Sequence, residues 1–145
     1  MGTVLVIDDD RDIRGLLRYT LQEEGWSVVE AADGREGLDQ LRAAGEPLVT
    51  LLDYRMPHMD GFDVLRAVAA NSALATRHAY LLITANPYSL PSALPELAGM
   101  LGVPILGKPF DLDDLCTRIQ QAHVGLAARH INGSAGWQPH SIRCA

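Results

Sequence analysis

The segment VLVIDDD, residues 4–10, decides the fold of this 145-residue chain. Its first four residues are apolar and mostly β-branched, a composition typical of a strand that is buried on both faces. Three aspartates follow at once. In a parallel α/β sheet the functional site lies beyond the carboxyl ends of the strands, so the residues directly after each strand are candidates for a site.

Short apolar segments alternate with segments of helical period along the rest of the chain. The predicted strands are residues 4–7, 27–30, 48–52, 80–83 and 103–106. The predicted helices are residues 11–24, 34–43, 62–70, 92–101 and 112–128. This alternation predicts an α/β fold, a doubly wound five-stranded parallel sheet with helices on both faces. Pro104 places the fifth strand at an edge of the sheet, because proline cannot donate a backbone hydrogen bond to a neighbouring strand.

Capping residues mark several of the predicted helix ends. Asp10 and Asp33 each stand directly before a predicted helix. Their carboxylates are expected to accept hydrogen bonds from the free N–H groups of the first turn. Gly25 is expected to end the first helix. The stretch 85–103 contains three prolines where the alternation requires a helix, so we expect a short helix there with Pro95 in its first turn.

Composition limits the class of protein. The chain is 48% hydrophobic and 21% charged, which is enough apolar material for one core and excludes a disordered chain. Its formal net charge of −6 makes it a poor electrostatic partner for nucleic acid or an anionic membrane. No apolar run reaches the roughly 20 residues of a membrane helix, no signal peptide is visible, and Cys116 and Cys144 fit a reducing compartment. A cytoplasmic protein is expected.

Chemically useful side chains follow the predicted strands. Asp8 and Asp9 follow the first strand, Asp53 the third, Thr84 the fourth and Lys108 the fifth. Carboxylates gathered at one sheet edge repel one another unless a hard divalent cation binds them, and Mg²⁺ suits such oxygen ligands. An Asp53 oxygen is then the candidate nucleophile for a phosphoryl group, with Mg²⁺ and Lys108 neutralising charge and Thr84 donating a hydrogen bond.

Four segments in order carry a resemblance to a known family. They are residues 4–10 (VLVIDDD), 51–61 (LLDYRMPHMDG), 82–85 (LITA) and 108–110 (KPF). Over about residues 3–125 the chain resembles the receiver domain of two-component response regulators, a flavodoxin-like fold. The resemblance implies a signalling protein that is not an enzyme beyond its own phosphorylation and dephosphorylation.

The resemblance also implies roles for particular residues. Asp53 would be the phosphoacceptor, and Asp8, Asp9, Asp53 and the backbone carbonyl of Arg55 would bind Mg²⁺. Thr84 and Lys108 would contact the phosphoryl group, and the Lys108–Pro109 peptide would be cis. The family tunes hydrolysis at two positions, which here are Arg55 and Asn86.

The same resemblance implies the partners. The phosphoryl donor would be a phosphohistidine on a sensor histidine kinase or a phosphotransfer protein, and an unidentified downstream protein would read the phosphorylated state. Direct binding to nucleic acid or membrane is not expected, and the chain would be a monomer or a weak homodimer.

Some features depart from the family pattern. Ile105 stands where the family usually carries an aromatic residue, and the stretch between Thr84 and Lys108 is longer than usual. Both lie on the common output surface of the family. We expect a single receiver domain over residues 1–128, then a flexible tail over residues 129–145 that is too short for an output domain.

Alternative functions remain open at this point. The departures at the output surface favour a receiver-fold module that binds or dimerises without phosphorylation. A hydrolase with an aspartyl-phosphate intermediate would carry a second aspartate two residues after Asp53, where this chain has Arg55. Residues 102–108 read G-x-x-x-x-G-K, but Pro109 follows in place of the serine or threonine of a nucleotide-binding loop.

Overall fold

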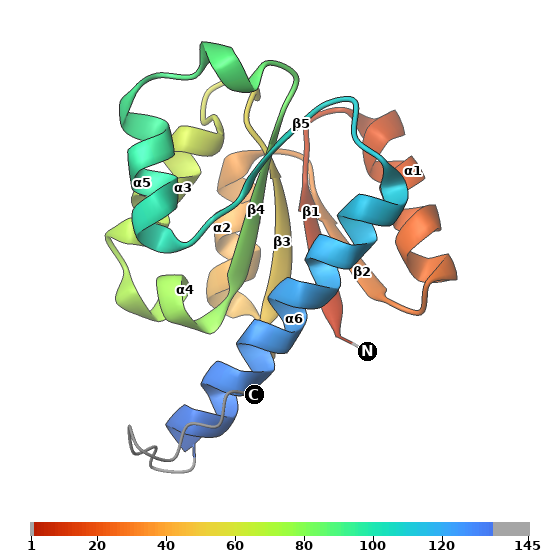
Figure 1. The fold of residues 1–145 in the computed structure, drawn as a ribbon, viewed down its shortest axis with the longest axis vertical. Coiled ribbons are helices and arrows are strands. Elements are labelled where there is room, and N and C mark those ends of the chain that lie inside the picture. The colour runs from red at the N-terminus through yellow and green to blue at the C-terminus, as the bar shows by residue number, and fades with distance from the viewer. Residues whose placement is uncertain (1, 135–145) are drawn as a thin grey trace.

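The computed structural model of the chain describes residues 2–134, with side chains up to residue 129. Five parallel strands form one sheet in the order β2-β1-β3-β4-β5 (Figure 1). The strands are β1 (Thr3–Ile7), β2 (Ser27–Ala31), β3 (Leu48–Asp53), β4 (Ala79–Thr84) and β5 (Ile105–Gly107). The predicted doubly wound parallel sheet is confirmed, and β5 lies at an edge as predicted.

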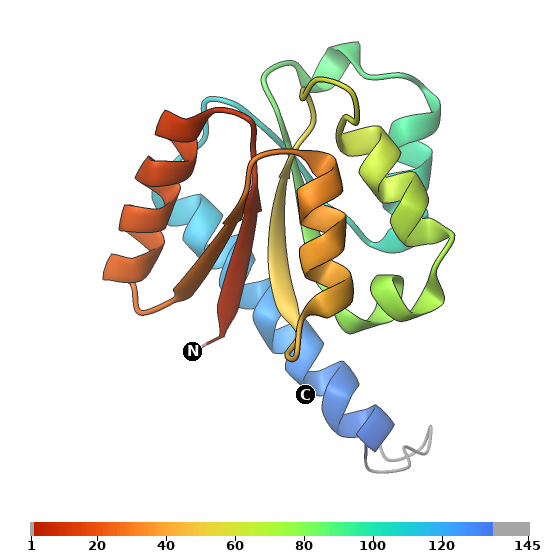
Figure 2. The same ribbon diagram turned by 180° about the vertical axis from the view of Figure 1, so that it is seen from behind.

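Helices cover both faces of the sheet (Figures 1 and 2). The helices are α1 (Arg11–Glu23), α2 (Gly34–Ala43), α3 (Gly61–Ala69), α4 (Ser72–Arg77), the 3₁₀ turn η1 (Pro87–Ser89), α5 (Ala93–Leu101) and α6 (Leu112–Ser134). α1 and α6 pack on one face, while α2, α3, α4 and α5 pack on the other.

The two faces of the strands build two separate cores. In β1, Leu5 and Ile7 join the core beneath α2, α3 and α5, while Val4 and Val6 join the core beneath α1 and α6. All four side chains are at most 1% exposed. Because successive side chains of a strand point to opposite faces, a strand covered on both sides must be apolar at every position. This explains the unbroken apolar run at residues 4–7.

The predicted helix caps are present. The Asp10 carboxylate accepts hydrogen bonds from backbone N–H groups in the first turn of α1, and the Asp33 carboxylate does the same for α2. After α1 the chain turns at Gly25, whose φ is 97°, a left-handed conformation that glycine adopts without strain. Pro95 lies in the first turn of α5, as predicted.

Two helical segments differ from the predictions. α4 was not predicted, because its six residues are too few to show an apolar period; the Asn71 side chain caps it. α6 was predicted to end at residue 128 and continues to Ser134. Leu126 is buried under the sheet, and Arg129 Nη1 donates to the Thr76 carbonyl of α4 at 3.0 Å, so the last turns have their own contacts. The first six residues of the predicted tail are therefore helical, and residues 135–145 lie outside the described part.

The fifth strand begins two residues later than predicted. The Val103 N–H donates to the Ala98 carbonyl of α5 at 2.8 Å, so Val103 belongs to the end of that helix. Pro104 has no N–H, and its carbonyl accepts from the Leu82 N–H at 2.9 Å. Pairing proper starts at Ile105. Residues 105–107 of the G-x-x-x-x-G-K segment are thus strand, which rules out a nucleotide-binding loop.

Among residues 2–134, no helix combines the length and the apolar character that a transmembrane span requires.

His78 is a buried residue whose role the sequence did not reveal. It is 1% exposed and lies between α4 and β4. Its Nδ1 accepts a hydrogen bond from the Leu48 N–H at 2.9 Å, and its Nε2 lies 3.0 Å from the Leu41 carbonyl oxygen. One imidazole thus joins the end of α2 to the start of β3. This contact lies at the amino-terminal end of the strands, opposite the strand-end aspartates.

Replacing His78 by leucine is expected to lower the free energy of unfolding by about 2 kcal/mol. The change leaves the buried Leu48 N–H and Leu41 carbonyl without their side-chain partner, and an unpaired buried polar group costs about 1–3 kcal/mol. Urea unfolding at neutral pH measures the effect. The matched control is His58→Asn, because His58 is exposed and asparagine tolerates its left-handed φ of 69°. This change is expected to stay within about 0.5 kcal/mol. Equal effects of the two variants would contradict the structural role of His78.

Candidate functional site

The carboxyl edge of the sheet brings together side chains from four strands. Asp8 directly follows β1, Asp53 ends β3, Thr84 ends β4 and Lys108 directly follows β5. Because β1, β3, β4 and β5 are neighbours in register, these residues meet. Together with Asp9 they line a cavity of about 230 Å³. Every residue that the sequence singled out for a strand-end site thus lies in one place.

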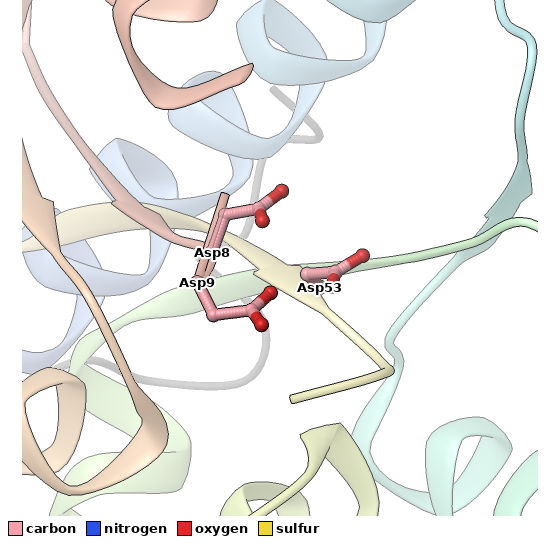
Figure 3. A group of neighbouring side chains, drawn as sticks. All are labelled: Asp8, Asp9 and Asp53. Carbon is pink, nitrogen blue, oxygen red and sulfur yellow. The ribbon is translucent and has the colours of Figure 1, made fainter. Parts of the chain in front are cut away.

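Three carboxylates form the acidic part of the cavity. Asp8, Asp9 and Asp53 each offer an oxygen that lies within 4.8 Å of the others, and their side chains extend in the same direction (Figure 3). Asp8 and Asp53 are buried, at 4% and 7% exposure, while Asp9 is exposed. Hard oxygen donors at this spacing fit a hard divalent cation such as Mg²⁺.

Lys108 is the cation of the site. Its Nζ lies 3.1 Å from Asp53 Oδ1 and 4.0 Å from Asp8 Oδ2. The backbone holds this lysine in position, because the Lys108 N–H donates to the Thr84 carbonyl at 2.7 Å. The Lys108–Pro109 peptide is cis, as predicted. One ammonium group therefore faces three carboxylates, which leaves a surplus of negative charge.

Burial and the surplus charge together change the acidity of the buried carboxyls. Burial first, and then the charge of Asp8, raise the pKa of Asp53 to about 6, although Lys108 opposes the shift. Burial also raises the pKa of Asp8 above its ordinary value. A divalent cation in the cavity would reverse both effects, because it favours the charged form of each carboxyl.

Without Mg²⁺, Asp53→Asn is expected to stabilise the chain at pH 8 by on the order of 2–3 kcal/mol. The folded state keeps the Asp53 proton up to a pH of about 6, while the unfolded state releases it near 3.8. Ionisation of Asp53 therefore lowers stability as the pH rises between these values, and asparagine removes this loss. The gain is expected to disappear as the pH falls toward about 4.

Urea unfolding of both chains at several pH values in a chelator measures this difference. Asp39→Asn serves as the control, because Asp39 is 68% exposed on α2 and pairs with the exposed Arg42. A pH-independent difference between Asp53→Asn and the unchanged chain would contradict the raised pKa of Asp53.

The third aspartate of the first segment has a different task. The Asp10 side chain accepts from the N–H groups of Asp12 and Ile13 at 2.9 and 3.2 Å, so it caps α1. The Asp10 N–H in turn donates to Asp8 Oδ1 at 2.9 Å and orients that carboxylate. The start of α1 thus fixes the position of an acidic residue of the cavity.

Thr84 combines a local contact with a place in the cavity. Its side chain is buried, and its hydroxyl oxygen accepts a hydrogen bond from the Asn86 N–H at 3.2 Å. The hydroxyl hydrogen is therefore available to a group that enters the cavity, since the oxygen accepts and does not donate in this contact.

The loop after β3 lies beside the cavity. Arg55 is among its lining residues. Gly61 does not adopt a positive φ. A Cβ at Gly61 would lie 2.8 Å from Leu82 and 2.9 Å from the Tyr54 backbone, so glycine is needed for close packing. The positive φ in this loop belongs to His58, at 69°.

Sequence reasoning missed one part of the cavity wall. Ile13 and Ser89 also line the cavity, together with Asn86, which the family resemblance had already singled out. Ile13 reaches it because α1 begins directly at the site, and Ser89 because η1 turns back over the end of β4. The Asn86–Pro87 pair, which favours a turn, was the available signal for η1.

The sheet order and the strand-end carboxylates define a flavodoxin-like α/β domain with its site at the carboxyl edge. A family model for the response regulator receiver domain matches residues 4–120. The chain belongs to this family.

Relatives and solved structures agree with the assignment. The chain is 38% identical over 119 residues to the response regulator MprA of Mycolicibacterium vanbaalenii (81% of this chain, 48% of that protein). It is 33% identical over 125 residues to the transcriptional regulatory protein CpxR of Escherichia coli K12 (83% of this chain, 48% of that protein). The chain thus spans about half the length of the curated relatives it matches.

Among solved structures, the chemotaxis protein CheY4 of Vibrio cholerae matches with a TM-score of 0.69 and 31% identity, covering 84% of this chain and 98% of that one. The response regulator TrrA of Thermotoga maritima, solved in complex with Mg²⁺-BeF, matches with a TM-score of 0.68 and 27% identity, covering 84% and 99%.

Proposed function

We propose that the chain accepts a phosphoryl group on Asp53 in the presence of Mg²⁺ and thereby switches the binding of a partner protein. The observation that carries this proposal is the environment of Asp53. Its carboxylate is buried, 3.1 Å from Lys108 Nζ, and clustered with Asp8 and Asp9. A nucleophilic oxygen beside a cation-binding cluster and an ammonium group suits the transfer of an anionic phosphoryl group.

Asp8, Asp9, Asp53 and the backbone carbonyl of Arg55 would hold Mg²⁺. The bound ion supplies positive charge for the phosphoryl oxygens. The relative solved with Mg²⁺-BeF supports this assignment, because the chain shares its fold and carries the acidic cluster.

The transfer is a direct displacement by the Asp53 carboxylate. An Asp53 oxygen attacks the phosphorus of a phosphohistidine, the P–N bond breaks, and its electron pair returns to the imidazole nitrogen of the donor. Lys108 leaves its ion pair with Asp53 to contact a phosphoryl oxygen, and the Thr84 hydroxyl donates to another. Charge on the phosphoryl group is thus neutralised where it develops.

The donor we propose is a sensor histidine kinase or a phosphotransfer protein, and the target is a downstream protein in the cytoplasm. We propose no contact of this domain with nucleic acid, since its net charge is −6. We further propose a monomer or a weak homodimer that catalyses no reaction on other substrates.

Incubation with Mg²⁺ and acetyl phosphate tests the proposal by intact-protein mass spectrometry. We expect one phosphoryl adduct, which is lost when Mg²⁺ is chelated before the donor is added. Asp53→Asn is expected to give none, while the exposed control Asp39→Asn keeps it. An adduct on another residue, or none at all, would overturn the proposal.

A second candidate is an interaction module that works without phosphorylation, favoured by Ile105 on the edge strand β5. The same incubation separates the two, because this module would form no adduct. Continuous release of phosphate would instead indicate an aspartyl-phosphate hydrolase.

A further inference from the structure

The turn η1 adds one side chain to the cavity that no strand end supplies. Ser89, its last residue, lines the cavity with Asp53, Thr84 and Lys108. We propose that the Ser89 hydroxyl binds the water that hydrolyses phosphorylated Asp53 and so sets the lifetime of the signal. This inference rests on the proposed function, since it concerns the removal of the phosphoryl group that Asp53 accepts.

Hydrogen bonds fix η1 relative to the site. The Asn86 N–H donates to the Thr84 hydroxyl oxygen at 3.2 Å, which joins the turn to the end of β4. Within the turn, the Tyr88 N–H donates to Asn86 Oδ1 and the Ser89 N–H donates to the Asn86 carbonyl, each at 3.2 Å. Ser89 therefore holds a defined position at the cavity.

A close contact anchors the other side of the turn. A Cβ added to Gly107 would lie 3.0 Å from Pro87 Cγ, so the proline ring sits directly on the backbone of β5. Lys108 directly follows Gly107, the last residue of β5. The turn is thus held between the two strand ends that carry Thr84 and Lys108, which leaves it little freedom to swing away.

The available hydrogen-bonding groups single out Ser89. Asn86 occupies a position that tunes hydrolysis in the family, but its Oδ1 caps η1 here. Thr84 already accepts from the Asn86 N–H. The Ser89 hydroxyl, by contrast, has no hydrogen-bond partner within residues 2–129, and Ser89 is exposed at the rim of the cavity. A free acceptor at the solvent side is suited to hold an entering water.

Hydrolysis returns Asp53 to its free carboxylate. A water oxygen attacks phosphorus, the bond from phosphorus to the Asp53 oxygen breaks, and its electron pair restores the Asp53 carboxylate. Inorganic phosphate leaves, and the water proton passes to the phosphate or to solvent. Ser89 Oγ accepts a hydrogen bond from the attacking water and orients it; as a neutral hydroxyl it takes no proton.

The test compares the decay of the phosphoryl adduct in four chains: unchanged, Ser89→Ala, Ser89→Thr and Ser92→Ala. Each is phosphorylated with acetyl phosphate and Mg²⁺, the donor is removed, and the adduct is followed by intact mass. One neutral hydrogen bond contributes about 0.5–1.5 kcal/mol, so Ser89→Ala is expected to decay about three- to tenfold more slowly. Ser89→Thr keeps the hydroxyl and is expected to decay like the unchanged chain.

Ser92 is the matched control. It is an exposed serine three residues further on, it makes no side-chain cap bond to α5, and it does not line the cavity. Ser92→Ala is expected to leave the decay unchanged. The unfolding free energy of Ser89→Ala without Mg²⁺ is expected to equal that of the unchanged chain. If Ser89 had a structural role instead, this substitution would lower the free energy of unfolding.

The outcomes separate the two proposals. An adduct that decays equally fast in Ser89→Ala and the unchanged chain overturns the role of Ser89 and leaves the phosphoacceptor standing. The role of Ser89 is also overturned if the adduct of Ser89→Thr decays as slowly as that of Ser89→Ala. The same holds if the adduct of Ser92→Ala decays as slowly as that of Ser89→Ala. Absence of any adduct in the unchanged chain overturns the proposed function itself.

Discussion

Replacement of Asp8 and Asp9 together by asparagine is expected to weaken Mg²⁺ binding by about 100-fold or more. Two of the three carboxylates within 4.8 Å of one another lose their charge, and amide oxygens are weaker ligands for a hard cation. Isothermal titration calorimetry with MgCl₂ measures the loss. Phosphorylation by acetyl phosphate at low Mg²⁺ is expected to disappear in parallel.

Asp10→Asn is the control for this variant. Asp10 is the next residue in the chain, and its side chain caps α1 through bonds that asparagine can also accept. Its Mg²⁺ affinity is expected to stay within about threefold of the unchanged chain, since Asp10 lines the cavity but does not belong to the cluster of three carboxylates. If the double variant bound Mg²⁺ as tightly as Asp10→Asn, the acidic cluster would not be the metal site.

Replacement of Lys108 by methionine is expected to slow phosphorylation of Asp53 by on the order of 10²–10³ at saturating Mg²⁺. Methionine fills a similar volume but provides no charge for a phosphoryl oxygen. The same change removes the contact at 3.1 Å that opposes the upward shift at Asp53. The pKa of Asp53 is therefore expected to rise above about 6 in the metal-free chain.

Two measurements check this prediction: the rate of adduct formation, and the carboxyl ¹³C resonance of Asp53 as a function of pH. Lys108→Arg separates charge from shape, because it keeps the charge on a longer, planar group. It is expected to hold the pKa of Asp53 near that of the unchanged chain while still slowing transfer. A Lys108→Met chain that is phosphorylated at the normal rate would exclude a role for the lysine.

The fold and the place of the site could be predicted because both depend on local signals. Buried parallel strands are apolar along their whole length, as at residues 4–7, and the residue after each strand end must lie at the sheet edge. The sheet order places β1, β3, β4 and β5 side by side, and this brings together Asp8, Asp53, Thr84 and Lys108. Their convergence on one cavity is confirmed, while their chemical roles stay predictions that the variants above test.

What the sequence did not reveal depends on contacts between distant segments. The imidazole of His78 bonds to residues 30 and 37 positions away, and no local pattern marks it. α6 continues past its predicted end because Arg129 meets α4, a helix too short to predict. Ser89 is held at the cavity by its turn η1, in which Pro87 packs on Gly107 of β5.

The direction of α6 has a practical consequence. The helix runs from the cavity side, near Leu112, past the opposite edge of the sheet, where its last turns project from the body (Figure 1). A fluorophore or a surface linker coupled to the variant Ala127→Cys, at an exposed position, would stand far from the cavity that holds Asp8 and Asp53. The domain could thus be immobilised for binding measurements with its acidic face open to a kinase.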